Sequence, residues 1–185
     1  EKEAETYISE EKGVASAAEA LAGAKDILAE SISDEADYRM HIRKLTFQKG
    51  ILTSAAKDPG QQSVYEMYYT YEEPVNKAAG HRILALNRGE NEKILTVKIA
   101  APEDDILRYL KKQIITKDNP VTAPVLEEVI EDSYKRLIAP AIERDIRNEL
   151  TEKAEDGAIR VFGKNLTQLL MQPPVKGHVT LGVDP

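Results

Sequence analysis

The sequence predicts a mainly α protein, an elongated multi-helix bundle with a small β element at about residues 51–54 and 93–100 and a C-terminal orphan strand. Helix-capping residues divide the first 50 residues, apolar positions recur at helical spacing from 124 to 170, and polar and apolar residues alternate over 93–99. An uninterrupted helix over 124–171 would measure about 70 Å, whereas a compact chain of this size has a radius of gyration of about 16 Å. We therefore expect the long helix to break, or the molecule to be elongated.

Two helices are expected in the first 50 residues. Ser16 and Glu19 form a capping box, in which the serine oxygen accepts a hydrogen bond from the first turn and the glutamate reaches back to the serine amide. Apolar residues then recur every three or four positions, so a helix begins there. Ser33 is a second N-cap candidate, because acidic residues follow it where the positive end of a helix favours them. Gly50 is suited to end the second helix.

The next segment combines a short strand with a tyrosine cluster. Residues 51–53 are a candidate strand, followed by a turn at Asp58-Pro59-Gly60. Tyr65, Tyr68 and Tyr69 then follow at helical spacing beside acidic residues, which predicts a helix whose rings pack in a core or an interface. Stacking of nucleic-acid bases on these rings is the alternative.

A helix is expected over residues 80–92, and the strand over 93–99 follows it and can pair with the first strand. Pro102 opens a further helix. Three acidic residues lie in its first turn and two lysines in its last, which suits both ends of the helix dipole.

A long apolar stripe dominates the last third of the sequence. Pro140 lacks the amide that would bond to residue 136, so we place a kink or break just before it, and Pro173 ends the helix. We expect residues 141–170 to pack firmly against the earlier helices, with Ile146 and Phe162 buried. The stripe consists of Leu126, Ile130, Leu137, Ile138, Ile142, Ile146, Leu150, Ala154, Ala158, Phe162, Leu166 and Leu170.

Composition excludes several classes of protein. With 42% hydrophobic residues, the 185-residue chain can form a core and is not disordered as a whole. No apolar run approaches the ~20 residues that a membrane helix needs, so we expect no membrane partner. The absence of cysteine excludes disulfides, thiolate zinc sites and a cysteine nucleophile, and it suits a reducing cytoplasm, where we place the protein.

The formal net charge of −7 argues against non-specific binding to nucleic acid, because that affinity comes from basic side chains that displace counterions. None of the segments 1–60, 61–120 and 121–185 carries more basic than acidic residues. The residues that remain as nucleic-acid-binding candidates are Arg82, Arg88 and Tyr69, two basic side chains and one stacking ring.

The sequence contains no recognisable catalytic constellation. It has no phosphate-binding glycine loop, HExxH zinc motif, GxSxG elbow or EF-hand loop. His41, His81 and His178 are isolated from one another, and Asp184 is a single carboxylate at the end of a strand-like segment. We therefore predict no enzyme activity, no catalytic residue, no metal site and no cofactor.

Five segments together form a more specific signal than any short motif. They are Ala20–Glu30 (ALAGAKDILAE), His81–Glu90 (HRILALNRGE), Tyr134–Arg144 (YKRLIAPAIER), Asn165–Leu166 with Leu169–Pro174, and Gly182–Pro185 (GVDP). In this order they resemble the bacterial Tex proteins, transcription accessory factors related to a eukaryotic transcription elongation factor. Ala79 and Gly80 depart from the family pattern, which usually has proline and serine there, but glycine is also an acceptable N-cap.

The resemblance implies that residues 1–176 are a helical central region, either one unit or two subdomains of about 1–120 and 121–176. Residues 177–185 would then begin a truncated RNase H-like domain. In the family an OB-fold RNA-binding domain and a helix-hairpin-helix segment follow, and nucleic-acid binding is attributed largely to the OB-fold. The implied partners are RNA or single-stranded DNA, contacted mainly through domains outside this chain, and the transcription machinery.

The leading hypothesis is that the chain is a fragment of a Tex-like transcription accessory factor that binds RNA, and that this piece is a non-catalytic helical scaffold. Its start at Glu1, without a methionine, and its end at Pro185 lead us to expect a piece of a longer protein. One alternative is part of a metal-dependent nuclease of RNase H-like type, with Asp184 as a ligand. Another is a weak RNA or single-stranded-DNA-binding module that uses Arg82, Arg88 and the tyrosines.

Overall fold

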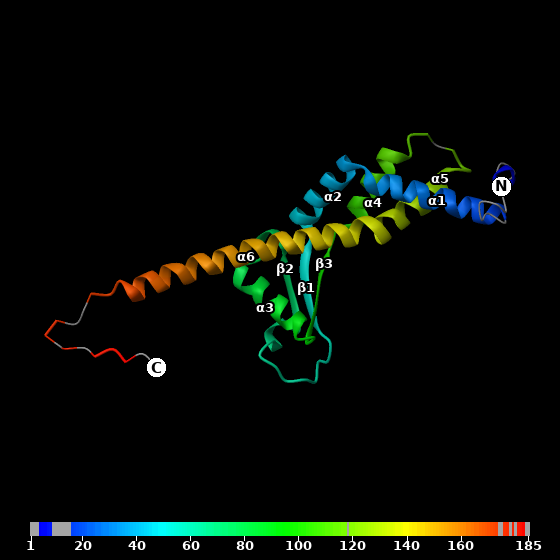
Figure 1. Cartoon of the computed structure of the whole chain (residues 1–185). Coiled ribbons are helices and arrows are strands. Elements are labelled where there is room, and N and C mark those ends of the chain that lie inside the picture. The colour runs from blue at the N-terminus through cyan, green and yellow to red at the C-terminus, as the bar shows by residue number, and fades with distance from the viewer. Residues whose placement is uncertain are drawn as a thin grey trace.

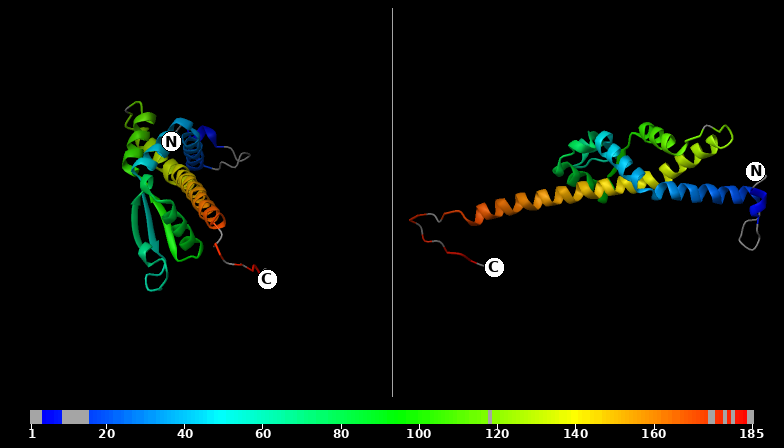
Figure 2. Two further views of the ribbon diagram at one scale, coloured as in Figure 1. Left: turned by 90° about the vertical axis from the view of Figure 1, so that its left-hand side faces the viewer. Right: turned by 90° about the horizontal axis from the view of Figure 1, so that it is seen from above.

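The computed structural model describes residues 4–8, 16–117, 119–173, 176–177, 179 and 181–183 of the chain. The helices and one small sheet pack into a body, and one end of a long helix projects from it (Figure 1). Two further views show that the molecule is long in one direction and narrow in the others (Figure 2). The prediction of an elongated, mainly α fold with a small β element is confirmed.

The first long helix begins where the capping residues predicted. A short 3-10 turn, η1 (Ala4–Tyr7), precedes α1 (Ala17–Asp34). The Ser16 hydroxyl oxygen accepts a hydrogen bond of 3.2 Å from the amide of Glu19, which satisfies one amide of the first turn. The second helix, α2 (Ala36–Lys49), follows after the single extended residue Glu35.

The prediction that Ser33 caps the second helix is wrong. Ser33 lies in the last turn of α1 and is 7% exposed, next to the buried Ile32. The N-cap of α2 is Glu35, which makes no capping hydrogen bond through its side chain. Burial of the last turn of α1 therefore outweighs the local capping preference of serine.

Gly50 ends α2 as predicted, although its backbone does not have the left-handed conformation for which glycine is usually preferred at the end of a helix. Its φ is −67°. A Cβ atom on Gly50 would lie 2.3 Å from the carbonyl oxygen of Thr46, so a side chain does not fit where the chain leaves α2 for the sheet.

Three antiparallel strands form the sheet in the order β2-β1-β3. They are β1 (Ile51–Ala56), β2 (Thr70–Pro74) and β3 (Leu95–Ala100). Leu52 of β1 lies opposite Glu73 of β2 and Ile99 of β3. The predicted pairing of the first and last of these strands is confirmed.

The helix predicted at the tyrosine cluster is absent, and this prediction is wrong. Residues 66–68 form only a 3-10 turn, η3 (Glu66–Tyr68), and β2 follows directly. The rings of Tyr65 and Tyr68 are nevertheless buried, at 5% and 8% exposure, as predicted for core packing. In β2, half-buried residues alternate with exposed ones, and this period of two fits an edge strand better than a helix.

Two helices flank the last strand. A 3-10 turn, η4 (Val75–Lys77), leads into α3 (Gly80–Asn91), and α4 (Glu103–Ile114) follows β3 after Pro102. Both helices agree with the predicted positions, although the N-cap of α3 is Ala79 rather than Gly80. The buried face of the sheet packs against α3 and the long helix.

The long apolar stripe forms three consecutive helical segments. They are α5 (Ala123–Asp132), the π-helix η5 (Ser133–Ile138) and α6 (Ala139–Leu170). The irregularity predicted just before Pro140 is this π-helix, in which the amide of Ala139 donates to the carbonyl of Tyr134, five residues back. The wider turn accommodates the proline, so the chain stays helical instead of breaking.

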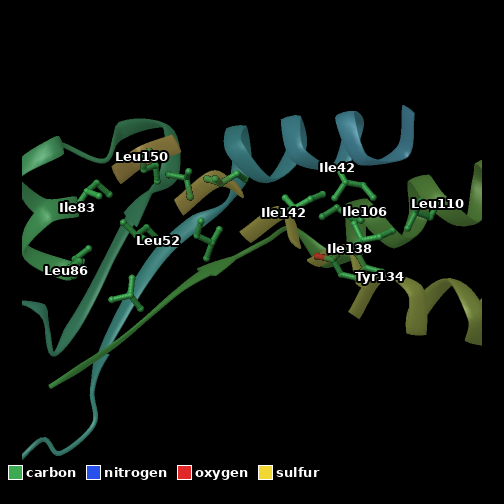
Figure 3. Packing of buried hydrophobic residues seen from close by; sticks show 14 of the residues in the cluster. Ile42, Leu52, Ile83, Leu86, Ile106, Leu110, Tyr134, Ile138, Ile142 and Leu150 are labelled. Carbon is green, nitrogen blue, oxygen red and sulfur yellow. The ribbon is translucent and has the colours of Figure 1, made fainter. Parts of the chain in front are cut away.

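A single cluster of buried apolar side chains joins residues from both sides of residue 120, so the body has one core. It runs from the sheet and α3 to the region where α2, α4 and the π-helix meet (Figure 3). Members of the cluster are Ile42, Leu52, Ile83, Leu86, Ile106, Leu110, Tyr134, Ile138, Ile142, Ile146 and Leu150.

The prediction that both Ile146 and Phe162 are buried is half wrong, because Phe162 lies in a part of α6 where every residue is exposed. Ile146 is fully buried as expected, but Phe162 is 67% exposed.

All residues from Glu155 to Leu170, which we call the arm, are exposed. The arm extends beyond the sheet and the other helices (Figure 1). Its exposed large apolar side chains are Ile159, Val161, Phe162, Leu166, Leu169 and Leu170.

The predicted C-terminal strand falls partly outside the described residues. His178, Thr180, Asp184 and Pro185 are not described, and Val179 and residues 181–183 are described without a strand. Among the described helices, none is both long enough and apolar enough to span a membrane.

Candidate functional site

Arg82 is held by side chains of the neighbouring strand. Its guanidinium donates to the Glu73 carboxylate at 2.5 Å and to the Tyr71 hydroxyl at 3.4 Å. Both partners lie on β2. The Tyr71 hydrogen bond and the Glu73 charge hold the pKa of Arg82 above its ordinary value. The side chain therefore joins α3 to the edge of the sheet, and a phosphate would compete with Glu73 for it.

Tyr69 is part of the loop between β1 and β2. Its hydroxyl donates to the carbonyl of Gln61 at 2.5 Å and lies 2.9 Å from the Ser63 hydroxyl. The ring is half-buried and packs against the core. Tyr69 thus holds the loop back onto the body, at a place separate from the contacts of Arg82.

Arg88 lies on the rim of a groove between α3 and α6. The groove has a volume of about 730 Å³, and Arg144 of α6 also lines it. Both arginines are exposed, and neither makes an ion pair with another described residue. The structure therefore separates the three predicted residues, since Arg82 contacts β2, Tyr69 contacts the loop and Arg88 faces α6.

A half-buried polar network centred on Arg147 lies beneath this groove. The guanidinium binds the two oxygens of Glu90 at 2.5 and 3.2 Å and also donates to Asn87 Oδ1 at 3.2 Å and to the carbonyl of Val97 at 3.3 Å. Asn87 in turn donates to the hydroxyl of Thr151 at 2.8 Å. This network joins α3, β3 and α6 at one point.

Burial alone would raise the pKa of Glu90, but the hydrogen bond and charge of Arg147 hold it below the ordinary value of 4.5. Glu90 also accepts from the amide of Val97 at 3.3 Å. The carboxylate is therefore ionised at neutral pH and acts as the fixed partner of Arg147.

Arg147 and Glu90 are not among the residues that the sequence predicts. Charged residues of both signs are interspersed along α3 and α6, and nothing in that pattern distinguishes a paired, half-buried charge from a solvated one. The sequence feature that could have indicated this network is the spacing of Asn87 and Glu90, which lie three residues apart on the same helical face.

The described residues contain no cluster of three or more histidine, aspartate or glutamate side chains that could hold a metal ion. His41 stacks on Tyr109, with ring centroids 3.8 Å apart, and is far in sequence from His81. Asp184, the metal-ligand candidate of the nuclease hypothesis, lies outside the described residues.

Comparison with known protein families identifies the chain. The model of the Tex central region-like family matches residues 1–162. The chain belongs to this family. The resemblance seen in the sequence segments is thereby confirmed.

Three relatives illustrate the Tex match. The uncharacterized protein YdcI of Bacillus subtilis is 56% identical over 98% of the chain. The human S1 RNA-binding domain-containing protein 1 is 32% identical over 94% of the chain, and the transcriptional accessory protein Tex of Neisseria gonorrhoeae is 31% identical over 100% of the chain. The matched region covers 26%, 19% and 25% of these proteins, so the chain spans only a minor part of the length of each relative.

Proposed function

We propose that the chain is the non-catalytic helical scaffold of a longer Tex-family transcription accessory protein, and that it holds RNA-binding domains in a fixed relation. The observation that carries this proposal is α6, a single helix of 32 residues and thus about 48 Å. Its first half packs one face into the body, and its second half is the arm. Such a helix transmits an orientation from the body to whatever packs on the arm.

Several contacts fix α6 on the body. The Arg147 network joins it to α3 and β3, and the Glu143 carboxylate accepts from the amide of Ile99 at 2.8 Å. Gly80 lets the start of α3 approach closely, because a Cβ there would lie 3.2 Å from the Cα of Ala154. These contacts fix α6 to α3 and β3 from Glu143 to Ala154, next to the start of the arm.

The arm presents an apolar face that fits a docked domain. Ile159, Phe162, Leu166 and Leu170 recur at spacings of three and four residues on one side of the helix. Burial of one such side chain contributes about 1.5–3 kcal/mol. Soluble monomers rarely leave a contiguous apolar surface of this kind uncovered, so we assign it to a further domain of the same polypeptide.

The names of relatives support the RNA and transcription parts of the proposal. The human relative is named for an S1 RNA-binding domain, and the Neisseria gonorrhoeae relative is named a transcriptional accessory protein. We extend the proposal to a cytoplasmic location, since a cysteine-free chain suits a reducing compartment.

A second candidate function is weak binding of RNA by this chain itself. Arg88 and Arg144 favour it, because they are exposed, without ion pairs among the described residues, and on opposite walls of one groove. The net charge of −7 opposes it.

Titration of the 185-residue chain with a labelled single-stranded RNA separates the two candidates. The scaffold proposal predicts a dissociation constant of about 0.1 mM or weaker at physiological salt, the range for non-specific electrostatic binding. Sub-micromolar affinity that is lost in Arg88→Ala and Arg144→Ala, but kept in Lys25→Ala, would instead assign RNA binding to the groove.

An insertion in the longer protein tests the scaffold directly. Four flexible Gly-Ser residues placed after Asp156 would uncouple the arm from the body without touching the core. We expect RNA affinity to stay within about twofold, because the RNA-binding domain is unchanged, while the stimulation of transcription is lost. Full activity of the inserted protein would contradict the scaffold proposal.

A further inference from the structure

The two outer edges of the three-stranded sheet differ in how their backbone groups are satisfied. β1 lies between β2 and β3, so each of these two strands has one edge without a neighbouring strand in the described part of the chain (Figure 1). In an antiparallel pair, every second residue exchanges backbone hydrogen bonds with its partner, and the residues between point their backbone groups the other way. Only an edge whose outward groups are unpaired can accept a further strand.

Side chains from α3 and α6 close the outer edge of β3. The amide of Val97 donates to the Glu90 carboxylate at 3.3 Å, and the amide of Ile99 donates to the Glu143 carboxylate at 2.8 Å. The carbonyl oxygen of Val97 accepts from Arg147 at 3.3 Å. These charged groups occupy the positions that the backbone of a further strand would need, so β3 does not accept one.

The hydrogen bonds at the two ends of β2 show which of its residues face β1. The amide of Val75 donates to the carbonyl of Gly50 at 3.0 Å, and the carbonyl of Tyr69 accepts from the amide of Ala56 at 3.2 Å. Both pairs continue the register of β1 and β2. The odd-numbered residues of β2 therefore bond to β1, and the even-numbered residues direct their backbone groups outward.

The outer edge of β2 is open. Its outward groups are the amides and carbonyl oxygens of Thr70 and Glu72 and the carbonyl oxygen of Pro74. None of these groups has a hydrogen-bond partner among the described residues, and all three residues are exposed. Unlike β3, this strand therefore retains a row of backbone donors and acceptors that can pair with another chain.

The side chains beside the open edge leave negative charge uncompensated. Glu73 is matched by Arg82 of α3. Glu72, and Glu66 in the turn before β2, are exposed and form no ion pair with another described residue. Residues 66–74 contain no lysine or arginine. A segment that pairs with this edge is therefore favoured if it brings positive charge.

A second copy of β2 does not fit the edge. Antiparallel self-pairing about Glu72 would place two like charges directly opposite each other, which is destabilising. It would also place Pro74, which has no amide, opposite Thr70. A lysine or arginine opposite Glu72 would instead form a favourable cross-strand pair, so the edge selects a basic strand over its own copy.

We propose that the open edge of β2 binds an extended basic segment of a partner protein, which adds to the sheet as a fourth, antiparallel strand. The segment exchanges backbone hydrogen bonds with Thr70 and Glu72. Its basic side chains lie beside Glu72, and the apolar side chains between them lie beside Tyr71. In this mode of recognition the main chain supplies affinity and the alternate side chains supply specificity. The surface belongs to the body and not to the arm, so the proposal goes beyond the scaffold function and does not depend on it.

Hydrogen exchange followed by nuclear magnetic resonance tests the proposal on the 185-residue chain, with the acetylated and amidated peptide Thr-Val-Lys-Val-Lys-Thr as the probe. In the free chain, the amides of Tyr71 and Glu73 should exchange slowly and those of Thr70 and Glu72 rapidly, because only the first two bond to β1. Saturating peptide should slow exchange at Thr70 and Glu72 at least about tenfold and leave the amides of β3 unchanged. Unchanged exchange at Thr70 and Glu72 would overturn the proposal.

The free chain also shows whether its own copy occupies the edge. We expect exchange at Thr70 and Glu72 to be independent of protein concentration when no peptide is present. Protection of these two amides that grows with protein concentration would assign the edge to self-association and would overturn the proposed partner.

Backbone methylation of the probe separates strand addition from simple attraction of charge. N-methylation of the two lysine amides keeps the charge but removes the donors that face β2, so this peptide should bind at least about tenfold more weakly. Its isomer with N-methyl groups on the two valine amides is the matched control, because those amides face away from β2 and binding should be retained. Equal binding of the two isomers would overturn strand addition.

A charge swap tests the preference for a basic partner. Glu72→Lys should weaken binding of the lysine peptide at least about threefold and allow binding of Thr-Val-Glu-Val-Glu-Thr, because the cross-strand pair is restored with reversed signs. Asp156→Lys, on the exposed arm, changes the net charge equally and is the matched control. Equal weakening in both variants, or no gain for the glutamate peptide with Glu72→Lys, would contradict selection of a basic segment by this edge.

Discussion

At Gly89, the lack of one methyl group decides how closely α3 and β3 approach. A Cβ atom there would lie 2.6 Å from Cδ1 of Leu95 and 3.2 Å from Cδ1 of Tyr65, and all three residues are buried. We expect Gly89→Ala to lower the free energy of unfolding by about 1–3 kcal/mol, the range for an overpacked core. Urea denaturation of the variant and the wild type measures this change in the free energy of unfolding.

Gly157 is the matched control for this substitution. It lies in the exposed arm, where a Cβ atom would meet no neighbouring atom within 4 Å outside its own stretch of helix. Gly157→Ala should raise stability by up to about 1 kcal/mol, since alanine is the better helix former. Equal effects of the two substitutions would show that packing at Gly89 is not the cause.

Glu90 provides a prediction about pH. Its pKa in the folded protein lies below the ordinary value of 4.5, so the unfolded state binds more protons near that pH and stability rises with pH there. Glu90→Gln should therefore be less stable than the wild type at pH 7. The difference should shrink as the pH falls below about 4.5 and the native carboxylate is protonated. A difference in unfolding free energy that is constant from pH 7 to the acid range would contradict the Arg147 pairing.

Residue types could be predicted from the sequence more readily than their partners. The sequence draws attention to Arg82, Arg88 and Tyr69 because basic and aromatic side chains suit nucleic acid. Their contacts with Glu73, α6 and Gln61 depend on how distant segments pack, which no local pattern records. The open edge of β2 is equally invisible before the sheet is assembled.

At the scale of elements, α6 shows that a helix can be predicted correctly while the burial of its residues is not. The apolar spacing correctly predicts a long helix, but it fails to predict burial at Phe162, because the arm extends beyond the body and all of its residues are exposed. The sequence does not predict β2 either, since three tyrosines at helical spacing precede the strand but only a 3-10 turn forms. The π-helix, by contrast, has a local cause in Pro140.

Two truncations on α6 test this distinction between its halves. Ile146→Ala should lower the free energy of unfolding by about 2–5 kcal/mol, because the side chain is fully buried. Phe162→Ala should change it by less than about 0.5 kcal/mol, because the ring is 67% exposed. Thermal and urea unfolding of both variants provide the measurement. A large loss in Phe162→Ala would mean that the arm folds back onto the body.

At the scale of the whole molecule, the central claim is that the body and the arm form one rigid unit. The chain has no cysteine, so pairs of spin labels can be attached at chosen sites without removing any native cysteine. Lys77 in the body and Lys164 on the arm are both exposed and suit one pair. Lys77 and Asp145, both in the body, form the control pair.

Pulsed electron paramagnetic resonance of Lys77→Cys with Lys164→Cys measures the distance distribution between body and arm. We expect a single narrow distribution, nearly as narrow as that of the control pair, because α6 continues without interruption from Ala139 to Leu170. A broad or multiple distribution for the arm pair, with a narrow one for the control, would show a hinge in α6 and would contradict the scaffold.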